Sequence, residues 1–229
     1  TIAVILARAG SRGLTHKNAR PVAGKPMLAW TLEHALQTPG LDRVVLSTDG
    51  DELARIARVA GVSVVLRPSY LADDTATVDA AARHAVEAVE QRQPRFAHVA
   101  LLYGNVPVRP ADLTARALAK LAETRCDSVQ SVCPVGKGHP FWMQQLTGDD
   151  GDAMTPYQPN NVYRRQDLPE VFALDGGIIA VTRESLFTTA PGQPHAFLGR
   201  DRRAVITEPG SVVDVDTATD LRLAEVTLQ

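Results

Sequence analysis

Short apolar runs alternate with amphipathic helical segments along most of this chain, and this alternation is the strongest constraint on its fold. The first run, residues 2–7, is continuously apolar, so it predicts a strand that is buried on both faces. Four further strands are expected at residues 43–47, 62–66, 98–102 and 128–132, with helices at residues 27–37, 51–59, 78–91 and 110–123. This order predicts an α/β fold, in which helices cover both faces of a mostly parallel sheet. Binding loops are then expected beyond the carboxyl ends of the strands.

The regular pattern is interrupted between about residues 136 and 171, where Gly, Pro, Asp and Asn cluster. We interpret this stretch as an arm inserted into a single domain that spans residues 1–229, a length that one domain can fill. Arms of this kind often pack against a second subunit. Strand patterns return at residues 176–181, 203–206 and 212–215, and a terminal helix is expected at residues 218–226.

Composition excludes several classes of protein. Apolar residues make up 45% of the chain, which predicts a folded core, and the net charge of -2 argues against a dedicated nucleic-acid binder. The run at residues 2–7 is too short to cross a membrane and lacks the features of a signal peptide. Cys126 and Cys133 form no C-x-x-C pair, and the histidines lack the spacing of zinc ligands. Two buried, reduced thiols and a cytoplasmic location are expected.

The charge of the first 32 residues is unlike that of the rest. They contain five cations and no acidic residue: Arg8, Arg12, Lys17, Arg20 and Lys25. Gly10 and Gly13 let the loop after the first strand approach a ligand closely, and the cations beside them suit a polyphosphate. The spacing matches neither a Walker A loop nor a dinucleotide fingerprint. The loop therefore predicts an anion site of another kind, and a solvated basic loop is the alternative.

The run ILARAGSRGLTHKN at residues 5–18 resembles the signature of the acylneuraminate cytidylyltransferase family, the CMP-sialic acid synthetases. The resemblance continues in family order at residues 42–50, 67–76, 164–169 and 213–217. It implies a Rossmann-like nucleotidyltransferase fold with a small dimerisation insertion, and a homodimer. It also implies CTP-dependent formation of a CMP-activated acidic sugar of the nonulosonic-acid type, with release of pyrophosphate.

The resemblance assigns roles to the matched positions. The implied nucleotide site comprises Ala7, Arg8, Gly10, Ser11, Arg12, Gly13, Lys17 and Asn18 around the triphosphate, and Arg67, Ala76 and Val78 around cytosine. The family often has a small hydroxyl residue in place of Val78, so Thr77 is the candidate to replace that contact. Arg8, Lys17 and Asp216 are the implied catalytic residues. No side chain stands out as a general base.

Asp214 and Asp216 correspond to the metal pair of the family. Alternate residues of an extended strand point to the same face, so the two carboxylates are expected to lie side by side. Carboxylate oxygens suit Mg²⁺, or Mn²⁺, shared with phosphate oxygens. Two like charges held this close are costly unless a cation binds between them.

Departures from the family pattern gather on the acceptor side. Where sialate-activating members read LLQPTSPLR, this chain has Tyr103 in place of the glutamine, and a later family asparagine is replaced by Asp175. The candidate acceptor-binding residues are Tyr103, Asn105, Arg109, Arg164, Arg165, Gln166 and Asp175. We hypothesise that CTP use is retained while the acceptor differs from N-acetylneuraminate, for example a phosphonate or another keto-deoxy sugar acid.

Two other functions remain as alternatives. A GT-A glycosyltransferase also combines a nucleotide fold with a D-x-D motif, but there the motif usually follows a mid-chain strand, whereas here it lies near residue 214. A non-catalytic nucleotide-binding protein would be expected to have lost Lys17 or the aspartate pair, and this chain keeps both. The expected partners are thus CTP and a small acidic acceptor, with neither nucleic acid nor membrane.

Overall fold

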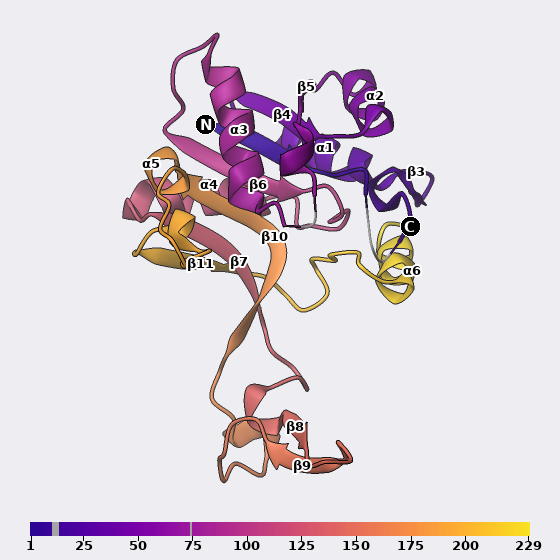
Figure 1. The fold of residues 1–229 in the computed structure, drawn as a ribbon, viewed down its shortest axis with the longest axis vertical. Coiled ribbons are helices and arrows are strands. Elements are labelled where there is room, and N and C mark those ends of the chain that lie inside the picture. The colour runs from indigo at the N-terminus through magenta and orange to yellow at the C-terminus, as the bar shows by residue number, and fades with distance from the viewer. Residues whose placement is uncertain (11–13, 74) are drawn as a thin grey trace.

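The computed structural model describes residues 1–10, 14–73 and 75–229 (Figure 1). Three residues of the predicted phosphate loop, Ser11, Arg12 and Gly13, lie outside the described residues, as does Asp74.

A seven-stranded sheet forms the centre of the body, in the order β11-β7-β10-β6-β1-β4-β5. Its strands are β1 (Ile2–Leu6), β4 (Arg43–Thr48), β5 (Ser63–Leu66), β6 (His98–Tyr103), β7 (Ser128–Pro134), β10 (Phe172–Thr182) and β11 (Arg202–Ile206). The first strand pairs in parallel with β4 and with β6, and β11 pairs in parallel with β7. The strand β10 runs antiparallel to both of its neighbours. The predicted mostly parallel sheet is confirmed.

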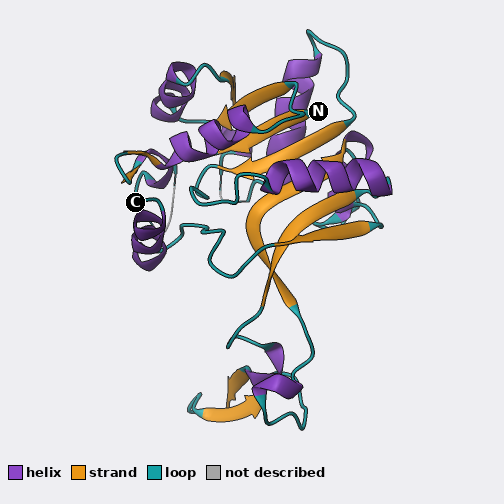
Figure 2. Cartoon of the chain, turned by 180° about the vertical axis from the view of Figure 1, so that it is seen from behind, coloured by secondary structure: helices purple, strands orange, loops and turns teal. Residues whose placement is uncertain are grey.

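Helices cover both faces of this sheet (Figure 2). They are α1 (Met27–Gln37), α2 (Asp51–Val59), α3 (Val78–Glu90), α4 (Leu113–Thr124), α5 (Arg183–Leu186) and α6 (Ala218–Thr227). Side chains of β1 alternate between two cores: Ala3 and Ile5 pack with α1, α2 and α4, whereas Ile2 and Val4 pack with α3 and α5. Burial on both faces explains why the first strand reads as an unbroken apolar run. Cys126 is buried as expected, but Cys133 is only half-buried, so the expectation of two buried thiols was wrong for one of them.

The predicted strand at residues 212–215 was wrong. This segment makes only an isolated antiparallel bridge, between Val213 and Val108, before the chain enters α6. The reason is that it passes beside the loop that follows β6 and not beside a full strand. The predicted helix at residues 110–123 begins instead at Leu113, whose N–H closes a turn on the carbonyl of Pro110.

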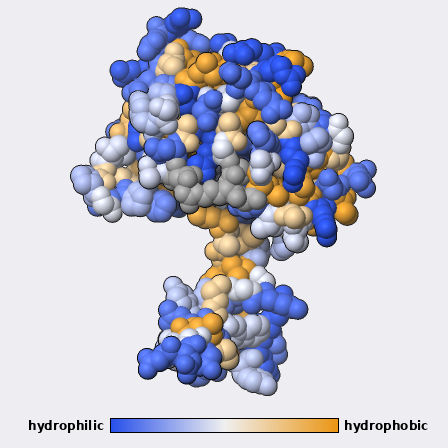
Figure 3. Space-filling view, turned by 45° about the vertical axis from the view of Figure 1, so that its right-hand side comes forward, coloured by the Kyte–Doolittle hydropathy of each residue, from blue (hydrophilic) through white to orange (hydrophobic). Residues whose placement is uncertain are grey.

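The strands β7 and β10 leave the sheet together as a ribbon, still paired at Phe172 and Pro134, and carry the arm away from the body (Figure 1). The arm holds the hairpin of β8 (Gln144–Thr147) and β9 (Ala153–Pro156), and the 3-10 turns η3 (Pro140–Trp142) and η4 (Arg165–Asp167). A register shift in β10, with Gly176 at a φ of 76°, marks where the ribbon leaves the sheet. Apolar surface continues along the neck between body and arm (Figure 3).

Shorter elements complete the body. They are η1 (Lys17–Ala19), the hairpin of β2 (Pro21–Val22) and β3 (Lys25–Pro26), η2 (Ser69–Leu71) and η5 (Ala196–Leu198). No helix among the described residues has both the length and the apolar character needed to span a membrane.

Candidate active site

A cleft of about 470 Å³ lies at the carboxyl ends of β1 and β6, where the sequence predicted a site. Ten of the predicted site residues line it: Arg8, Gly10, Lys17, Asn18, Arg67, Ala76, Val78, Tyr103, Asn105 and Asp216. Ala7 is buried directly behind the cleft, at the end of β1. The cleft thus joins the N-terminal loop, the middle of the chain and its C-terminal segment.

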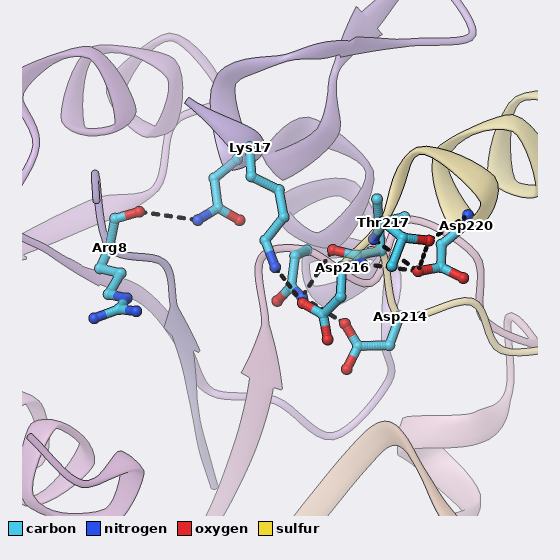
Figure 4. Close-up of polar contacts among 9 residues, drawn as sticks. Arg8, Lys17, Asp214, Asp216, Thr217 and Asp220 are labelled. Carbon is cyan, nitrogen blue, oxygen red and sulfur yellow. Dashed lines mark hydrogen bonds and ion pairs between the residues drawn. The ribbon is translucent and has the colours of Figure 1, made fainter. Parts of the chain in front are cut away.

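Lys17 and Asp216 meet across this cleft although they are 199 residues apart in the chain. The Lys17 ammonium donates to Oδ1 of Asp216 at 2.6 Å, and Asp214 lies beside this pair (Figure 4). Lys17 comes from η1, which turns the cationic loop toward the C-terminal segment, and its side chain is only 12% exposed. The structure therefore brings the basic loop and the acidic pair together, as the sequence analysis required.

Backbone contacts fix the segment that carries the two aspartates. The N–H of Val215 donates to the carbonyl of Asn105 at 2.9 Å, and the N–H of Val213 donates to the carbonyl of Val108 at 3.2 Å. The Asn105 amide also donates to Oδ1 of Asp214. Partial burial, together with the nearby negative charge of Asp216, raises the pKa of Asp214 to about 6. A cation placed between these carboxylates would relieve this unfavourable charge.

Asp220 is a site-supporting residue that the sequence analysis missed. It accepts hydrogen bonds from the N–H groups of Asp216 and Thr217 and from the Thr217 hydroxyl. With Thr217 as N-cap, it forms a capping box at the start of α6, which fixes the backbone of Asp216. The hydroxyl of Thr217 and these N–H groups hold the pKa of Asp220 below its ordinary value. The T-x-x-D spacing ahead of the terminal helix was the available signal.

Arg67 lies at the bottom of the cleft, held by Ser47 of β4. Its Nε donates to the Ser47 hydroxyl and its Nη2 to the Ser47 carbonyl, each at 2.8 Å. Burial lowers its pKa to about 10, so the guanidinium remains a cation near neutral pH. Ser47 is fully buried. The sequence analysis identified Arg67 but gave no role to Ser47, because only the folded sheet brings them together.

Asp73, Ala76 and Thr77 also line this cleft. The Asp73 carboxylate accepts from the N–H groups of Thr75 and Ala76, and the Asp73 carbonyl accepts from Arg8 at 3.4 Å. Thr77 caps α3 by accepting from the N–H of Ala80, so its hydroxyl is already engaged. Replacement of the missing base contact by Thr77 would require it to share that hydroxyl.

Asn18 lies inside the cleft wall with 7% of its surface exposed. Its Nδ2 donates to the carbonyl of Arg8 at 3.0 Å, and its Oδ1 has no partner among the described residues. The amide nitrogen carries two hydrogens, and the bond to Arg8 uses one of them. Asn18 thus supports the backbone of Arg8, and its contact with the phosphates stays a prediction.

Arg109, predicted to bind the acceptor, is turned into the protein. Its guanidinium donates to the carbonyls of Tyr103, Val106 and Gly177 and to the Thr31 hydroxyl. Burial lowers its pKa to about 9. These four contacts use its donors to tie together the loop after β6, the helix α1 and the root of the arm. The prediction that Arg109 binds a carboxylate is therefore corrected to a structural role.

Asp175 is also engaged internally. Its carboxylate accepts from the Ser131 and Thr207 hydroxyls and from the N–H of Gly177 at 2.9 Å. These bonds satisfy both oxygens where the arm ribbon leaves the sheet. The expectation that Asp175 meets an acceptor amine or hydroxyl is corrected: the carboxylate stabilises the bend in β10. Of the candidates on the body, Tyr103 and Asn105 remain in the cleft.

The three remaining acceptor candidates, Arg164, Arg165 and Gln166, are exposed at η4 of the arm. Arg164 pairs with Asp167 at 2.8 Å within the same turn. The arm extends away from the body, so the structure does not bring these side chains to the cleft of their own chain (Figure 1).

The acidic pair has the chemistry of a metal site that is completed by other ligands. Within the described ranges, no group of three or more His, Cys, Asp or Glu side chains converges in a way that could hold a metal ion. Asp214 and Asp216 offer carboxylate oxygens beside the cleft, the donor type that Mg²⁺ prefers. Since Mg²⁺ usually binds through one or two carboxylates plus phosphates and water, the pair fits a cation that arrives with a nucleotide.

Known proteins share both the sequence pattern and the fold. A family described as Cytidylyltransferase matches residues 2–168. The chain is 30% identical to the N-acylneuraminate cytidylyltransferase of Escherichia coli O18:K1:H7 over all of its own length, but spans only 52% of that protein. It is also 30% identical to the CMP-N,N'-diacetyllegionaminic acid synthase of Legionella pneumophila, where the match covers 98% of this chain and 94% of that protein.

Among solved structures, CMP:2-keto-3-deoxy-manno-octonic acid synthetase complexed with CTP has a TM-score of 0.72 at 18% identity, covering 99% of this chain and 97% of the other. This likeness confirms the predicted fold. The family match over residues 2–168, together with the two relatives, confirms the resemblance found in the sequence. The chain belongs to the cytidylyltransferase family.

Proposed function

We propose that this chain transfers CMP from CTP to a small acidic sugar of the nonulosonic-acid type and releases pyrophosphate. The observation that carries the proposal is the 2.6 Å contact between Lys17 and Asp216, because it places a phosphate-binding cation against a carboxylate pair within one cleft. Arg67, Ala76 and Thr77 line the same cleft and would supply a site for the base. Relatives named for CMP transfer to sugar acids support this choice of substrates.

The chain's own residues would act mainly by positioning and charge. The acceptor hydroxyl oxygen attacks the α-phosphorus in line, a new P–O bond forms, and the bond to the bridging oxygen of pyrophosphate breaks. Lys17 would leave Asp216 and stabilise the charge that develops on the leaving pyrophosphate, with Arg8 beside it. The acceptor proton passes to solvent, since the described cleft residues offer no dedicated base.

Asp214 and Asp216 would hold Mg²⁺ or Mn²⁺. When bound, the metal would neutralise phosphate charge and lower the pKa of the acceptor hydroxyl. Asn105 and Asp220 hold the two aspartates in place before any ligand binds.

A homodimer is part of the proposal. The arm exposes large apolar side chains that its own chain does not cover: Trp142, Met143, Leu146, Met154, Tyr157 and Tyr163. Exposed apolar surface on this scale is typical of an interaction site. In a two-fold dimer, the arm of one subunit would bring Arg164, Arg165 and Gln166 to the cleft of the other, where they would bind the acceptor's carboxylate. We also infer a cytoplasmic location, because both cysteines are free thiols.

Few side chains of the body are left to recognise the acceptor. Arg109 and Asp175 are engaged internally, so recognition falls to Tyr103 and to the arm. A phosphonate or another keto-deoxy sugar acid would satisfy the same cations.

The test is pyrophosphate release from CTP and Mg²⁺ across a panel of acceptors that includes N-acetylneuraminate. We expect turnover with CTP and an acidic keto sugar, and little with UTP. The best turnover with N-acetylneuraminate would contradict a changed acceptor. Silence across the panel, despite measurable CTP binding, would favour a non-catalytic nucleotide-binding protein, and transfer from a nucleotide sugar would favour a glycosyltransferase.

A further inference from the structure

Asn105 makes both a backbone and a side-chain contact with the segment that carries the acidic pair. Its carbonyl accepts from the N–H of Val215 at 2.9 Å, and its side-chain Nδ2 donates to Oδ1 of Asp214. The same Nδ2 lies 3.4 Å from the carbonyl of Val215. Asn105 alone thus holds both the backbone and a carboxylate of a segment that lies about 110 positions away in the chain.

The loop that presents Asn105 is itself rigidly held. Arg109 donates to the carbonyls of Tyr103 and Val106, and the Thr31 hydroxyl lies 3.1 Å from each of these carbonyls, so that it can donate to either. Both anchors are inside the fold, because Thr31 is fully buried and burial of Arg109 lowers its pKa to about 9. Asn105 therefore extends from a fixed platform rather than from a mobile loop.

Gly104 brings this platform close to the phosphate loop. Its N–H donates to the carbonyl of Leu6 at 3.0 Å, and a Cβ at this position would lie only 2.7 Å from the Cβ of Ala7. A side chain at position 104 would push the loop away from β1. The glycine thereby lets Asn105 reach the acidic pair on the side of the cleft where Lys17 lies.

The Asn105 amide is the donor that orients Asp214. It donates to Oδ1 of the carboxylate, and Oδ2 lies 3.1 Å from where a Cβ at position 176 would be. Gly176 therefore leaves room for the carboxylate in this orientation, and the Asn105 amide holds it there. A carboxylate whose orientation is fixed by a neighbouring donor binds a metal ion better than one that must be ordered first.

We propose that Asn105 is a positioning residue that orients Asp214 for metal binding, rather than a ligand of the acceptor. This inference rests on the proposed function, because it assumes that Asp214 and Asp216 bind the metal. Loss of the amide donor would leave Asp214 unoriented, while the backbone contact between position 105 and Val215 would persist.

The experiment compares wild type with Asn105→Ala and Asn105→Ser. Serine keeps a hydroxyl donor at this position, although with shorter reach. The matched control is Ser211→Ala, which removes a 2.7 Å hydrogen bond to the carbonyl of Glu208 in the same connecting segment without touching the aspartates. Mn²⁺ is the probe, and its binding to the protein in the presence of saturating CTP, without acceptor, is followed by electron paramagnetic resonance.

We expect Asn105→Ala to weaken Mn²⁺ binding about tenfold, since loss of a group that orients a metal ligand typically costs about 10- to 100-fold in affinity. Asn105→Ser should recover part of the loss, and Ser211→Ala should bind as wild type does. In turnover assays, the free Mg²⁺ needed for half activity should rise while KM for the acceptor stays constant.

Two results would overturn the inference: wild-type Mn²⁺ affinity in Asn105→Ala, or a raised acceptor KM with an unchanged metal requirement. If Asn105→Ala fails to fold, Asn105→Ser decides by the same measurements. If the wild-type protein bound no Mn²⁺ and turned over without metal, the proposed metal site itself would be wrong. If the wild type bound Mn²⁺ and Asn105→Ala bound it equally well, only the role of Asn105 would be wrong.

Discussion

The nucleotide side and the acceptor side of the cleft differ in how many of their candidate binding residues the body of the protein holds in place. On the nucleotide side, Lys17 and Arg67 are held by contacts within the body and line the cleft. On the acceptor side, Arg109 and Asp175 form hydrogen bonds with groups inside the protein, and three other candidates lie on the arm. Under the proposed function, the phosphate and base side is thus preformed, whereas acceptor binding would fall to Tyr103 and to an arm that would reach the cleft only in a dimer.

The largest effect is expected from Asp216→Ala, which removes half of the carboxylate pair. Loss of a metal ligand costs several kcal/mol of transition-state stabilisation, so kcat should fall about 10³-fold. Unfolding by urea should be unchanged, because Asp216 is exposed. Asp112→Ala, an exposed aspartate of α4, is the control and should keep full activity. Wild-type turnover by Asp216→Ala at limiting Mg²⁺ would contradict the assignment.

Lys17→Ala should lower kcat about 10²-fold and raise KM for CTP, because one preorganised cation facing the phosphates is lost. Lys25→Ala is the matched control: this lysine belongs to the same basic stretch but pairs with Glu33 outside the cleft. Steady-state kinetics with varied CTP measure both. If Lys17→Ala kept the wild-type kcat and the wild-type KM for CTP, the assignment of Lys17 to phosphate binding would be wrong.

Asp175→Ala separates a structural role from acceptor binding. It leaves the Ser131 and Thr207 hydroxyls and the N–H of Gly177 without their acceptor, so we expect a loss of about 2 kcal/mol in the free energy of unfolding. Acceptor KM, measured at a temperature well below the unfolding transition, should not change. A stable variant with a raised acceptor KM would restore the original expectation for Asp175.

The smallest effect concerns pH and His34, which lies behind the acceptor-side loop. Burial lowers the pKa of His34 to about 4, with the charge of Arg109 adding to the effect. The unfolded chain, with a pKa near 6.5, binds the proton more readily, so stability falls as pH drops from about 6.5 toward 4. Between pH 7 and pH 5.5 this amounts to about 1 kcal/mol. Urea unfolding of His34→Gln should show a flatter pH dependence than wild type; an identical slope would remove His34 as the cause.

The sequence predicted the fold where local pattern determines it. The apolar run at residues 2–7 and the amphipathic pattern of residues 27–37 correspond to β1 and α1, because burial is continuous along β1 and periodic along α1. The strand at residues 212–215 was wrong, since an apolar alternation cannot reveal that only one bridge to Val108 is available.

The sequence predicted those residues of the candidate site that belong to recognisable motifs. Lys17 and Asp216 belong to motifs, and the fold brings them together. Arg109 and Asp175 were misread because a charged residue in a loop looks the same in sequence whether it faces a ligand or a buried carbonyl. Ser47 carries no local signal at all, because its function depends on a neighbour 20 positions away that only the sheet supplies.

The contact between Lys17 and Asp216 has a thermodynamic consequence for ligand binding. Each charge satisfies the other, so whichever ligand binds first must bear the full cost of separating them. The second ligand then binds a charge that is already separated from its internal partner. CTP and the divalent cation should therefore each raise the affinity of the other by the same factor, as linkage requires of any two ligands that compete with one shared internal contact.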